Sequence, residues 1–321
     1  MYYQALHVKD YQLTIFFKLK NICIILFMLF IVFNPIVSAK GASNGLTLWY
    51  SILIPSIFPS MLISKLLISL NFDDLINKWF YPLFKHIFPI TKYCVFSIVF
   101  SIIAGLPTSS AIIYHLYKSE KISIYEAKYL IILTSNPSIT FLINYVAYHI
   151  LNKAFSLYIV LFIVYFSSYL SSYIYYICNK KYFKESAYLS FSDKKNNLAP
   201  QSTNEILLDS IKTITFVGIY VMIFSIIQQN VYYLFNNIYI TTVIACVLEI
   251  SSACNMCLSI SELPIRFMFT MICSTFCGIC AFFQINSVAN IGKNNILFII
   301  KYKMLSAACA LSITIILLYV L

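Results

Sequence analysis

Residues 94–117 read CVFSIVFSIIAGLPTSSAIIYHLY, an apolar stretch that is interrupted at its centre by Gly105 and Pro107. Proline removes a backbone hydrogen-bond donor and glycine weakens a helix, so the pair predicts a break at this point. In lipid, the backbone groups that a break frees must meet protein, water or a bound solute. The stretch therefore predicts a broken or re-entrant membrane helix.

The rest of the chain has the composition of a membrane protein. Of its 321 residues, 61% are hydrophobic and only 10% are charged, whereas about a quarter are charged in an ordinary soluble domain. The mean hydropathy is +0.84. The apolar segments are continuous, which favours helices over the alternating strands of a barrel. These segments are residues 21–37, 44–70, 94–117, 125–150, 154–178, 206–235, 238–260, 264–291 and 297–321.

We expect an all-α polytopic membrane protein with four regions. Residues 1–43 form an N-terminal tail and a first span, which is either a signal anchor or a cleaved signal. Residues 44–178 form a first membrane repeat, 179–205 a Lys-rich cytoplasmic linker, and 206–321 a second repeat. Residues 73–90 combine aromatic and basic side chains, which is typical of a strip at the membrane interface.

The lysines indicate the topology, because cytoplasmic loops carry an excess of Lys and Arg. If every segment crossed the membrane, the linker would face outward. If residues 94–117 and 238–260 instead fold back as re-entrant hairpins, the lysine clusters share the inner side. These clusters are Lys18 and Lys20; Lys78, Lys85 and Lys92; Lys118, Lys121 and Lys128; the linker; and Lys293, Lys301 and Lys303. The halves then become inverted repeats, a common build of secondary transporters; a plain nine-span bundle is the alternative.

Four places combine helix-breaking residues with polar side chains: residues 105–110 (GLPTSS), 134–138 (TSNPS), 249–255 (EISSACN) and 278–287 (GICAFFQINS). A half-helix N-terminus at such a break presents free N–H groups and partial positive charge, which suits an anion. A simple kink with locally bonded side chains is the alternative for any one break. The candidate substrate-binding residues are Gly105, Pro107, Thr108, Ser109, Ser110, Asn136, Ser138, Glu249, Ser251, Ser252, Asn255, Gly278, Gln284 and Asn286.

Glu249 is the only carboxylate deep inside an apolar segment, where a charge costs about 2.5–3.5 kcal/mol. It is expected either to handle a proton, a cation or the solute, or to join helices by hydrogen bonds. Gln284 and Asn286 are its candidate partners.

The cysteines offer a metal or redox alternative that we do not favour. CxxC spacing occurs at Cys254 with Cys257 and at Cys277 with Cys280. All four lie in apolar segments, whereas zinc sites are usually presented by turns, so we expect small packing residues and no metal site. The chain contains no HExxH motif and no phosphate-binding Gly-Lys motif, so we expect no enzyme activity, no catalytic residue and no cofactor.

The first half resembles the YlbJ-type sporulation integral membrane proteins, of the nucleoside-recognition or Gate-domain group, over several motifs. NGLTLWYSILIPSIFPSMLISKLL (residues 44–67) resembles the opening segment of that family through its Trp and paired prolines. GLPTSS resembles a Gly-aromatic-Pro-x-Gly-Ala turn through Gly105 and Pro107, with Ser109 in place of the second glycine. SNPSITF resembles an Asn-rich break through Asn136, with Ser135 in place of one asparagine.

In the second half, VLEIS resembles a Leu-Glu-x-Thr segment through Glu249, and FCGICAFFQ resembles a Phe-Gly-Gly…Gln segment through Gly278 and Gln284, with Cys277 in place of a glycine. The resemblance implies a protein of the forespore envelope, in a family linked to moving dipicolinic acid. We expect a transporter or channel for a small anionic solute, foremost dipicolinic acid. The alternatives are a nucleoside-like carrier and a structural membrane protein of spore formation.

The expected partners follow from this reading. They are the lipid bilayer, the anionic solute and, in addition, further copies of the chain or other sporulation membrane proteins. The net charge of +11 comes from lysine clusters between the spans and not from one basic face, so nucleic acid is not an expected partner.

Overall fold

The computed structural model describes residues 25, 27–70, 72–183, 202–235, 237–292 and 295–320, and within these ranges the chain forms helices and no strand. Four helical segments there are long and apolar enough to cross a membrane, and two bent pairs raise the number to six. The predicted all-α polytopic membrane fold is confirmed. The four segments are α8 (Leu157–Cys178), α10 (Thr203–Leu234), the combined segment Leu263–Val288 and α15 (Asn295–Val320).

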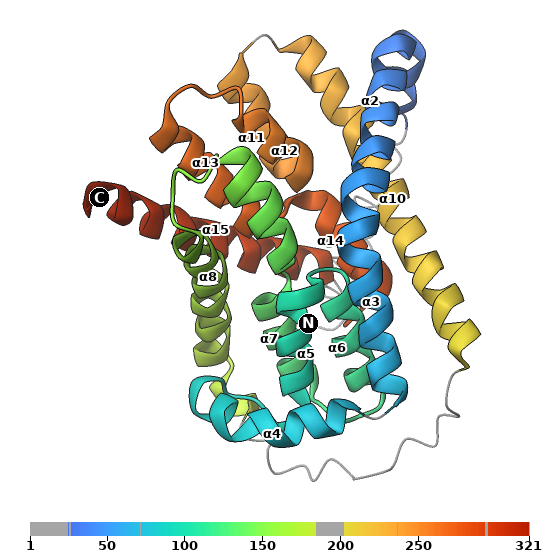
Figure 1. Cartoon of the computed structure of the whole chain (residues 1–321), viewed down its shortest axis with the longest axis vertical. Coiled ribbons are helices and arrows are strands. Elements are labelled where there is room, and N and C mark those ends of the chain that lie inside the picture. The colour runs from blue at the N-terminus through green and yellow to red at the C-terminus, as the bar shows by residue number, and fades with distance from the viewer. Residues whose placement is uncertain are drawn as a thin grey trace, which may run out of the picture.

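The first bent pair contains α2 (Pro35–Leu48), η1 (Trp49–Leu53) and α3 (Ile54–Ser69), with a bend of 51°. Helix α2 packs along α10, and Figure 1 shows the two side by side. A Cβ on Gly41 would lie 2.8 Å from the Cα of Ile226, so only glycine permits this approach. The helix is continuous through this contact, and the boundary expected after residue 43 lies inside α2.

Helix α4 (Phe72–Ile87) lies across the foot of the molecule in Figure 1. It turns by 107° into the segment Lys92–Ala104, which includes the short helix η2 (Lys92–Cys94). Trp79 and Leu83 are exposed on α4, while Asn77 is buried and its Oδ1 accepts a hydrogen bond of 2.8 Å from the Phe96 N–H. One apolar face is thus free to meet lipid, as expected of an interfacial helix.

Two pairs of short helices occupy the segments that were expected to be re-entrant. They are α5 (Val95–Ala104) with α6 (Thr108–Lys118), and α11 (Ile238–Leu248) with α12 (Ile250–Cys257). At 1.5 Å per residue, each helix is about 12–16 Å long, roughly half of a 30 Å hydrocarbon core. In Figure 1, α5 and α6 lie in the lower half with α4, and α11 and α12 lie in the upper half.

Two longer segments also contain a break. The first joins α7 (Ile124–Thr134) to η3 (Phe141–Ile150), and the second joins α13 (Leu263–Phe276) to α14 (Gly278–Val288). Helix α7 begins with a capping box between Ser123 and Glu126. The Glu126 carboxylate is buried and also accepts a bond of 2.9 Å from the Thr91 N–H. Glu126 is therefore buried as well as Glu249, and its capping bonds at the start of α7 hold it there.

Most of the predicted linker 179–205 lies outside the described residues, as do Lys18, Lys20 and Lys293. At the end of the linker, α10 begins with a capping box between Ser202 and Glu205. A disulfide joins Cys246 of α11 to Cys273 of α13, a pairing that the sequence did not predict.

Candidate functional site

The chain departs from helical geometry at all four predicted breaks. Gly105 and Gly278 have positive φ angles of 66° and 79°, which glycine adopts at little cost. Cys277, with φ 70°, is left-handed as well, and Glu249 is extended at φ −155° and ψ 133°. Residues 135–138 separate α7 from the helical turn that leads into η3.

Within each half, the break of the short-helix pair packs directly against the break of the longer segment. A Cβ on Gly105 would lie 2.5 Å from the Ser138 backbone nitrogen, and the Leu106 N–H donates a 3.0 Å bond to the carbonyl oxygen of Asn136. A Cβ on Gly278 would lie 2.9 Å from the Glu249 backbone nitrogen. A glycine therefore makes the close approach possible in both halves.

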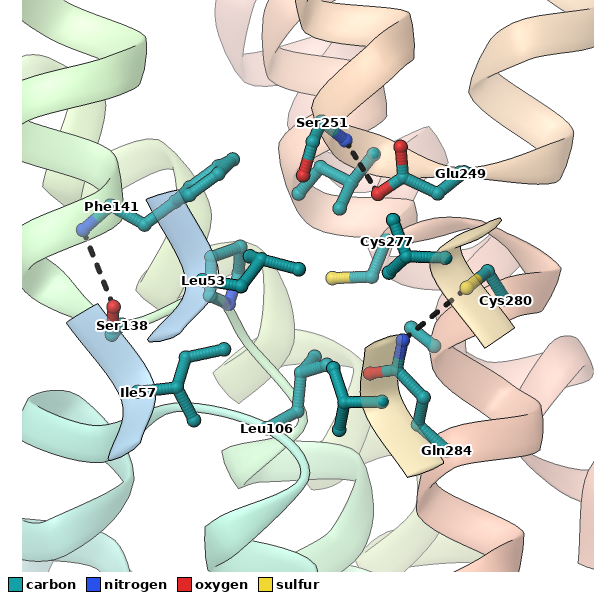
Figure 2. A pocket seen from close by; sticks show the side chains of 15 residues that line it. Leu53, Ile57, Leu106, Ser138, Phe141, Glu249, Ser251, Cys277, Cys280 and Gln284 are labelled. Atoms are coloured by element: carbon teal, nitrogen blue, oxygen red, sulfur yellow. Dashed lines mark hydrogen bonds between the residues drawn. The ribbon is translucent and has the colours of Figure 1, made fainter. Parts of the chain in front are cut away.

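Between the two pairs of breaks lies a cavity of about 50 Å³, shown in Figure 2. Every break contributes to its wall, and η1, α3 and α10 close it with apolar side chains. Ser138 and Phe141 lie across the cavity from Cys280 and Gln284 (Figure 2). The lining residues are Leu53, Ile57, Leu106, Pro137, Ser138, Phe141, Val217, Val221, Glu249, Ile250, Ser251, Cys277, Cys280, Ala281 and Gln284.

The Glu249 side chain caps the start of α12. Its carboxylate oxygens accept hydrogen bonds from the Ser251 N–H at 2.8 Å, the Ser252 N–H at 2.7 Å and the Ser252 hydroxyl at 2.8 Å. The partners expected from the sequence are wrong. Gln284 lines the same cavity but donates to the Cys280 sulfur at 3.3 Å, and Asn286 accepts from Asn295 at 3.4 Å. The nearest free N–H groups of a helix start satisfy the carboxylate first.

Helix α14 begins at the cavity wall without such a cap. Its N-cap residue, Cys277, has no side-chain capping bond, and Cys277, Cys280 and Ala281 all line the cavity. The first N–H groups of α14, which have no acceptor within the helix, and the positive end of its dipole therefore lie at this wall. Helix α6 also begins without a side-chain cap, at Pro107.

Buried hydroxyl groups gather near the breaks. Five of them have no hydrogen-bond partner among the described residues, although buried polar groups are usually paired. Ser251 lines the cavity, and the others lie in or beside the breaks of the first half. The five belong to Thr108, Ser110, Thr134, Ser135 and Ser251.

The structure brings only part of the predicted set to the cavity. Ser138, Glu249, Ser251 and Gln284 line it. A second group lies in or beside the breaks without lining the cavity: Gly105, Pro107, Thr108, Ser109, Ser110, Asn136, Ser252 and Gly278. Asn255 is exposed and Asn286 is half-buried, and neither lines the cavity. Cys254, Cys257, Cys277 and Cys280 are buried and free, and the last two line the cavity.

Sequence reasoning missed Lys303 of α15, which was assigned to a lysine cluster on the inner side of the membrane together with Lys301. Lys301 is exposed, but Lys303 is only 1% exposed. Its ammonium donates to the Ser135 carbonyl at 2.6 Å and to Asn136 Oδ1 at 3.1 Å. Two residues correspond to about 200° around a helix, so these lysines face opposite sides. An ionisable residue within an apolar segment was the available signal.

The buried charges of the site have no ion-pair partner among the described residues, where the sole salt bridge joins Lys65 to Asp209. In the same part of the chain, no group of three His, Cys, Asp or Glu side chains is arranged to hold a metal ion. The polar groups of the cavity are thus hydroxyls, one amide, one carboxylate and helix N–H groups, which can bind a polar solute by hydrogen bonds.

These features define a multi-pass α-helical membrane protein in which broken helices meet at an interior cavity. Over 134 residues, the chain is 25% identical to the sporulation integral membrane protein YlbJ of Bacillus subtilis (strain 168), a match that covers 40% of the chain and 33% of the relative. The chain thus matches about a third of that relative's length. No protein-family model and no solved structure matches the chain. The resemblance to YlbJ-type sporulation membrane proteins is confirmed as a weak homology.

Proposed function

We propose that the chain is a membrane transporter or channel for a small anionic solute and that the cavity is its binding site. The observation that carries this proposal is that all four breaks contribute to the wall of one cavity. Secondary transporters hold their solutes where broken helices meet, because unwound backbone and half-helix ends supply polar groups there. The site would bind and release the solute unchanged.

The arrangement of the halves supports the further proposal of inverted repeats. In each half, a pair of half-length helices is followed by a longer segment with a break, and the two breaks touch at a glycine. The two pairs lie toward opposite ends of the molecule in Figure 1. An inverted repeat would produce such a pattern, and alternating access would follow from movement of one repeat against the other.

An anion is favoured by the uncapped N-terminus of α14 and by the unpartnered hydroxyls around the breaks. The N-terminus of α12 is already occupied by Glu249. A second carboxylate in this cavity would be repelled while Glu249 is ionised, so uptake of the anion together with a proton on Glu249 would remove the conflict.

The cavity is too small for a solute such as dipicolinic acid, which supports the proposal that its wall moves when a solute binds. A volume of about 50 Å³ holds a few water molecules, whereas pockets for drug-sized ligands measure roughly 300–1,000 Å³. The apolar side chains of Leu53, Ile57, Val217 and Val221 line the cavity from η1, α3 and α10. We propose that these side chains move apart when a solute enters.

Dipicolinic acid is the first solute to test, because the resemblance to sporulation proteins implies it and its two carboxylates suit helix N–H groups. The proposed location is the forespore envelope. Association with further copies of the chain or with other sporulation membrane proteins stays a prediction.

A nucleoside-like solute is the second candidate. Glu249 and Gln284 lie in one wall of the cavity, and they can accept and donate hydrogen bonds to an uncharged polar ring. The apolar residues opposite them would contact the ring faces.

Uptake by liposomes that contain the purified protein tests both candidates. We expect labelled dipicolinate to enter protein-containing liposomes and not empty ones, and we expect unlabelled dicarboxylates to compete better than uridine or adenosine. Competition by nucleosides alone would favour the second candidate. If none of these solutes enters or competes, the proposed function is wrong.

A further inference from the structure

Lys303 of α15 reaches into the break of the other half of the chain. Its ammonium bonds the Ser135 carbonyl and the Asn136 side chain, which lie more than 160 residues away in sequence. The Ser168 hydroxyl of α8 donates to the same Asn136 oxygen at 2.7 Å. The Lys303 ammonium of α15 is therefore held at the break between α7 and η3, where α8 also contributes a hydrogen bond.

Lys303 does not line the cavity itself, but a single residue, Ser135, connects its ammonium to the cavity wall. Ser135 accepts from Lys303 at 2.6 Å, and the same carbonyl accepts from the Cys277 thiol at 3.7 Å. Cys277 lines the cavity and precedes the uncapped N-terminus of α14. The ammonium and the helix dipole thus act on the cavity from the same wall and with the same sign.

No acidic side chain neutralises Lys303 within the described residues. Glu249 accepts its hydrogen bonds from Ser251 and Ser252, and Glu126 accepts its hydrogen bonds from Ser123, Thr91 and Cys94. The groups that contact Lys303 are a carbonyl, an amide and, close by, the Cys277 thiol. In a protein interior, a charge without a counter-ion acts over longer distances than it does in water.

We propose that Lys303 is a positioning residue that makes the cavity selective for anions: its fixed positive charge strengthens the binding of a carboxylate at the start of α14. This inference rests on the proposed function and adds the residue that determines the sign of the solute charge. The polar contacts with Ser135 and Asn136 hold the ammonium in place without cancelling its charge.

Two substitutions separate the charge of Lys303 from its hydrogen bonds to Ser135 and Asn136. Lys303→Gln keeps hydrogen-bond donors but removes the charge, and Asn136→Asp keeps Lys303 but places a carboxylate beside it. Both should raise the KM for dipicolinate uptake by liposomes at least about tenfold, because the positive charge that attracts a carboxylate to the start of α14 is removed or neutralised. Vmax should change by less than about twofold, and Lys303→Arg should restore most of the affinity.

Lys301→Gln is the matched control, since Lys301 is exposed on the same helix; its KM should equal that of the wild type. If Lys303→Gln does not insert into the membrane, Asn136→Asp decides the question. A wild-type KM in both variants, or a loss of Vmax at unchanged KM, would overturn the inference while the proposed function stands. If nucleosides alone are recognised by the wild type, the inference is wrong and the second candidate function stands; if none of the tested solutes enters or competes, both are wrong.

Discussion

At the scale of single residues, Glu249 has two roles that conflict. Its carboxylate satisfies two backbone N–H groups at the start of α12, and it is also a buried negative group in the wall of a proposed anion site. A protonated carboxyl group would remove the repulsion and still accept a hydrogen bond. The proposed uptake of a proton together with the solute would resolve this conflict.

We predict that Glu249→Gln folds but loses the dependence of uptake on a pH gradient. The amide keeps the size and one accepting oxygen of the side chain, but it cannot ionise. Glu249→Leu removes every acceptor and leaves the Ser251 and Ser252 N–H groups unpaired, at a cost of roughly 1–3 kcal/mol for each group. The measurements are gradient-driven uptake and detergent melting of each variant. Unchanged uptake and melting in both variants would show that Glu249 lies outside the transport site.

The two glycines at the breaks give a second prediction at this scale. Gly105→Ala and Gly278→Ala should lower the melting temperature more than Gly292→Ala does. All three residues have positive φ, so each alanine carries a backbone strain of about 1–2 kcal/mol. Only at Gly105 and Gly278 would the new Cβ also meet backbone atoms, at 2.5 and 2.9 Å. At Gly292 the nearest atom is a side-chain carbon 3.7 Å away. Equal melting of all three variants would contradict the close approach of the breaks.

Individual site residues were only partly predictable from the sequence. Gly105, Pro107 and Glu249 were identified because helix breakers and carboxylates are rare within apolar segments. Lys303 was missed because a lysine near the end of an apolar stretch usually extends to the membrane surface. Which of two neighbouring lysines faces inward depends on how the helix packs, and the sequence alone does not show it.

At the scale of elements, four helices are too short to cross the membrane singly. Helices α5, α6, α11 and α12 contain 10, 11, 11 and 8 residues, so each is too short to cross a core of about 30 Å. The sequence indicated a break in each pair, and the lysine pattern favours an even number of crossings there, which stays a prediction. The break within α13 and α14 was placed correctly at Gly278, but its extent was not: helix α14 continues through Gln284 and Asn286.

We predict that the chain leaves the two short-helix pairs on opposite sides of the membrane, the first pair on the cytoplasmic side and the second on the outer side. In a chain whose native cysteines are replaced by alanine, single cysteines at Glu120 and Lys181 should react with an impermeant maleimide from the cytoplasmic side. Cysteines at Asn152 and Glu262 should react from the outer side. All four positions are exposed, so access depends on the side alone. Labelling of Glu120→Cys and Glu262→Cys from the same side would exclude the inverted repeat.

At the scale of the whole molecule, contacts between distant segments create the site. Lys303 on α15 bonds to the break between α7 and η3, and the Tyr145 hydroxyl of η3 donates to the Ser251 carbonyl of α12 at 3.0 Å. Each contact joins the first half to the second half. The sequence predicted four breaks but not the one cavity that they share, because the packing between the halves has no local signature.

This architecture also explains why the cavity is both apolar and polar. Helices of the N-terminal and central parts supply Leu53, Val217 and Val221, while the breaks supply Ser138, Glu249 and the N-terminus of α14. A solute bound here would be shielded from lipid by the apolar side chains and held by the polar ones.

The most direct measurement is the uptake of labelled dipicolinate by liposomes that contain either the wild type or a chain whose cavity is filled. Ala281 lines the cavity and is 3% exposed, so Ala281→Phe should fill it and reduce uptake to the level of empty liposomes. Ala308→Phe is the matched control on the exposed face of α15, and it should keep the wild-type rate. Wild-type uptake by a correctly inserted Ala281→Phe variant would contradict the claim that the four breaks form the solute site.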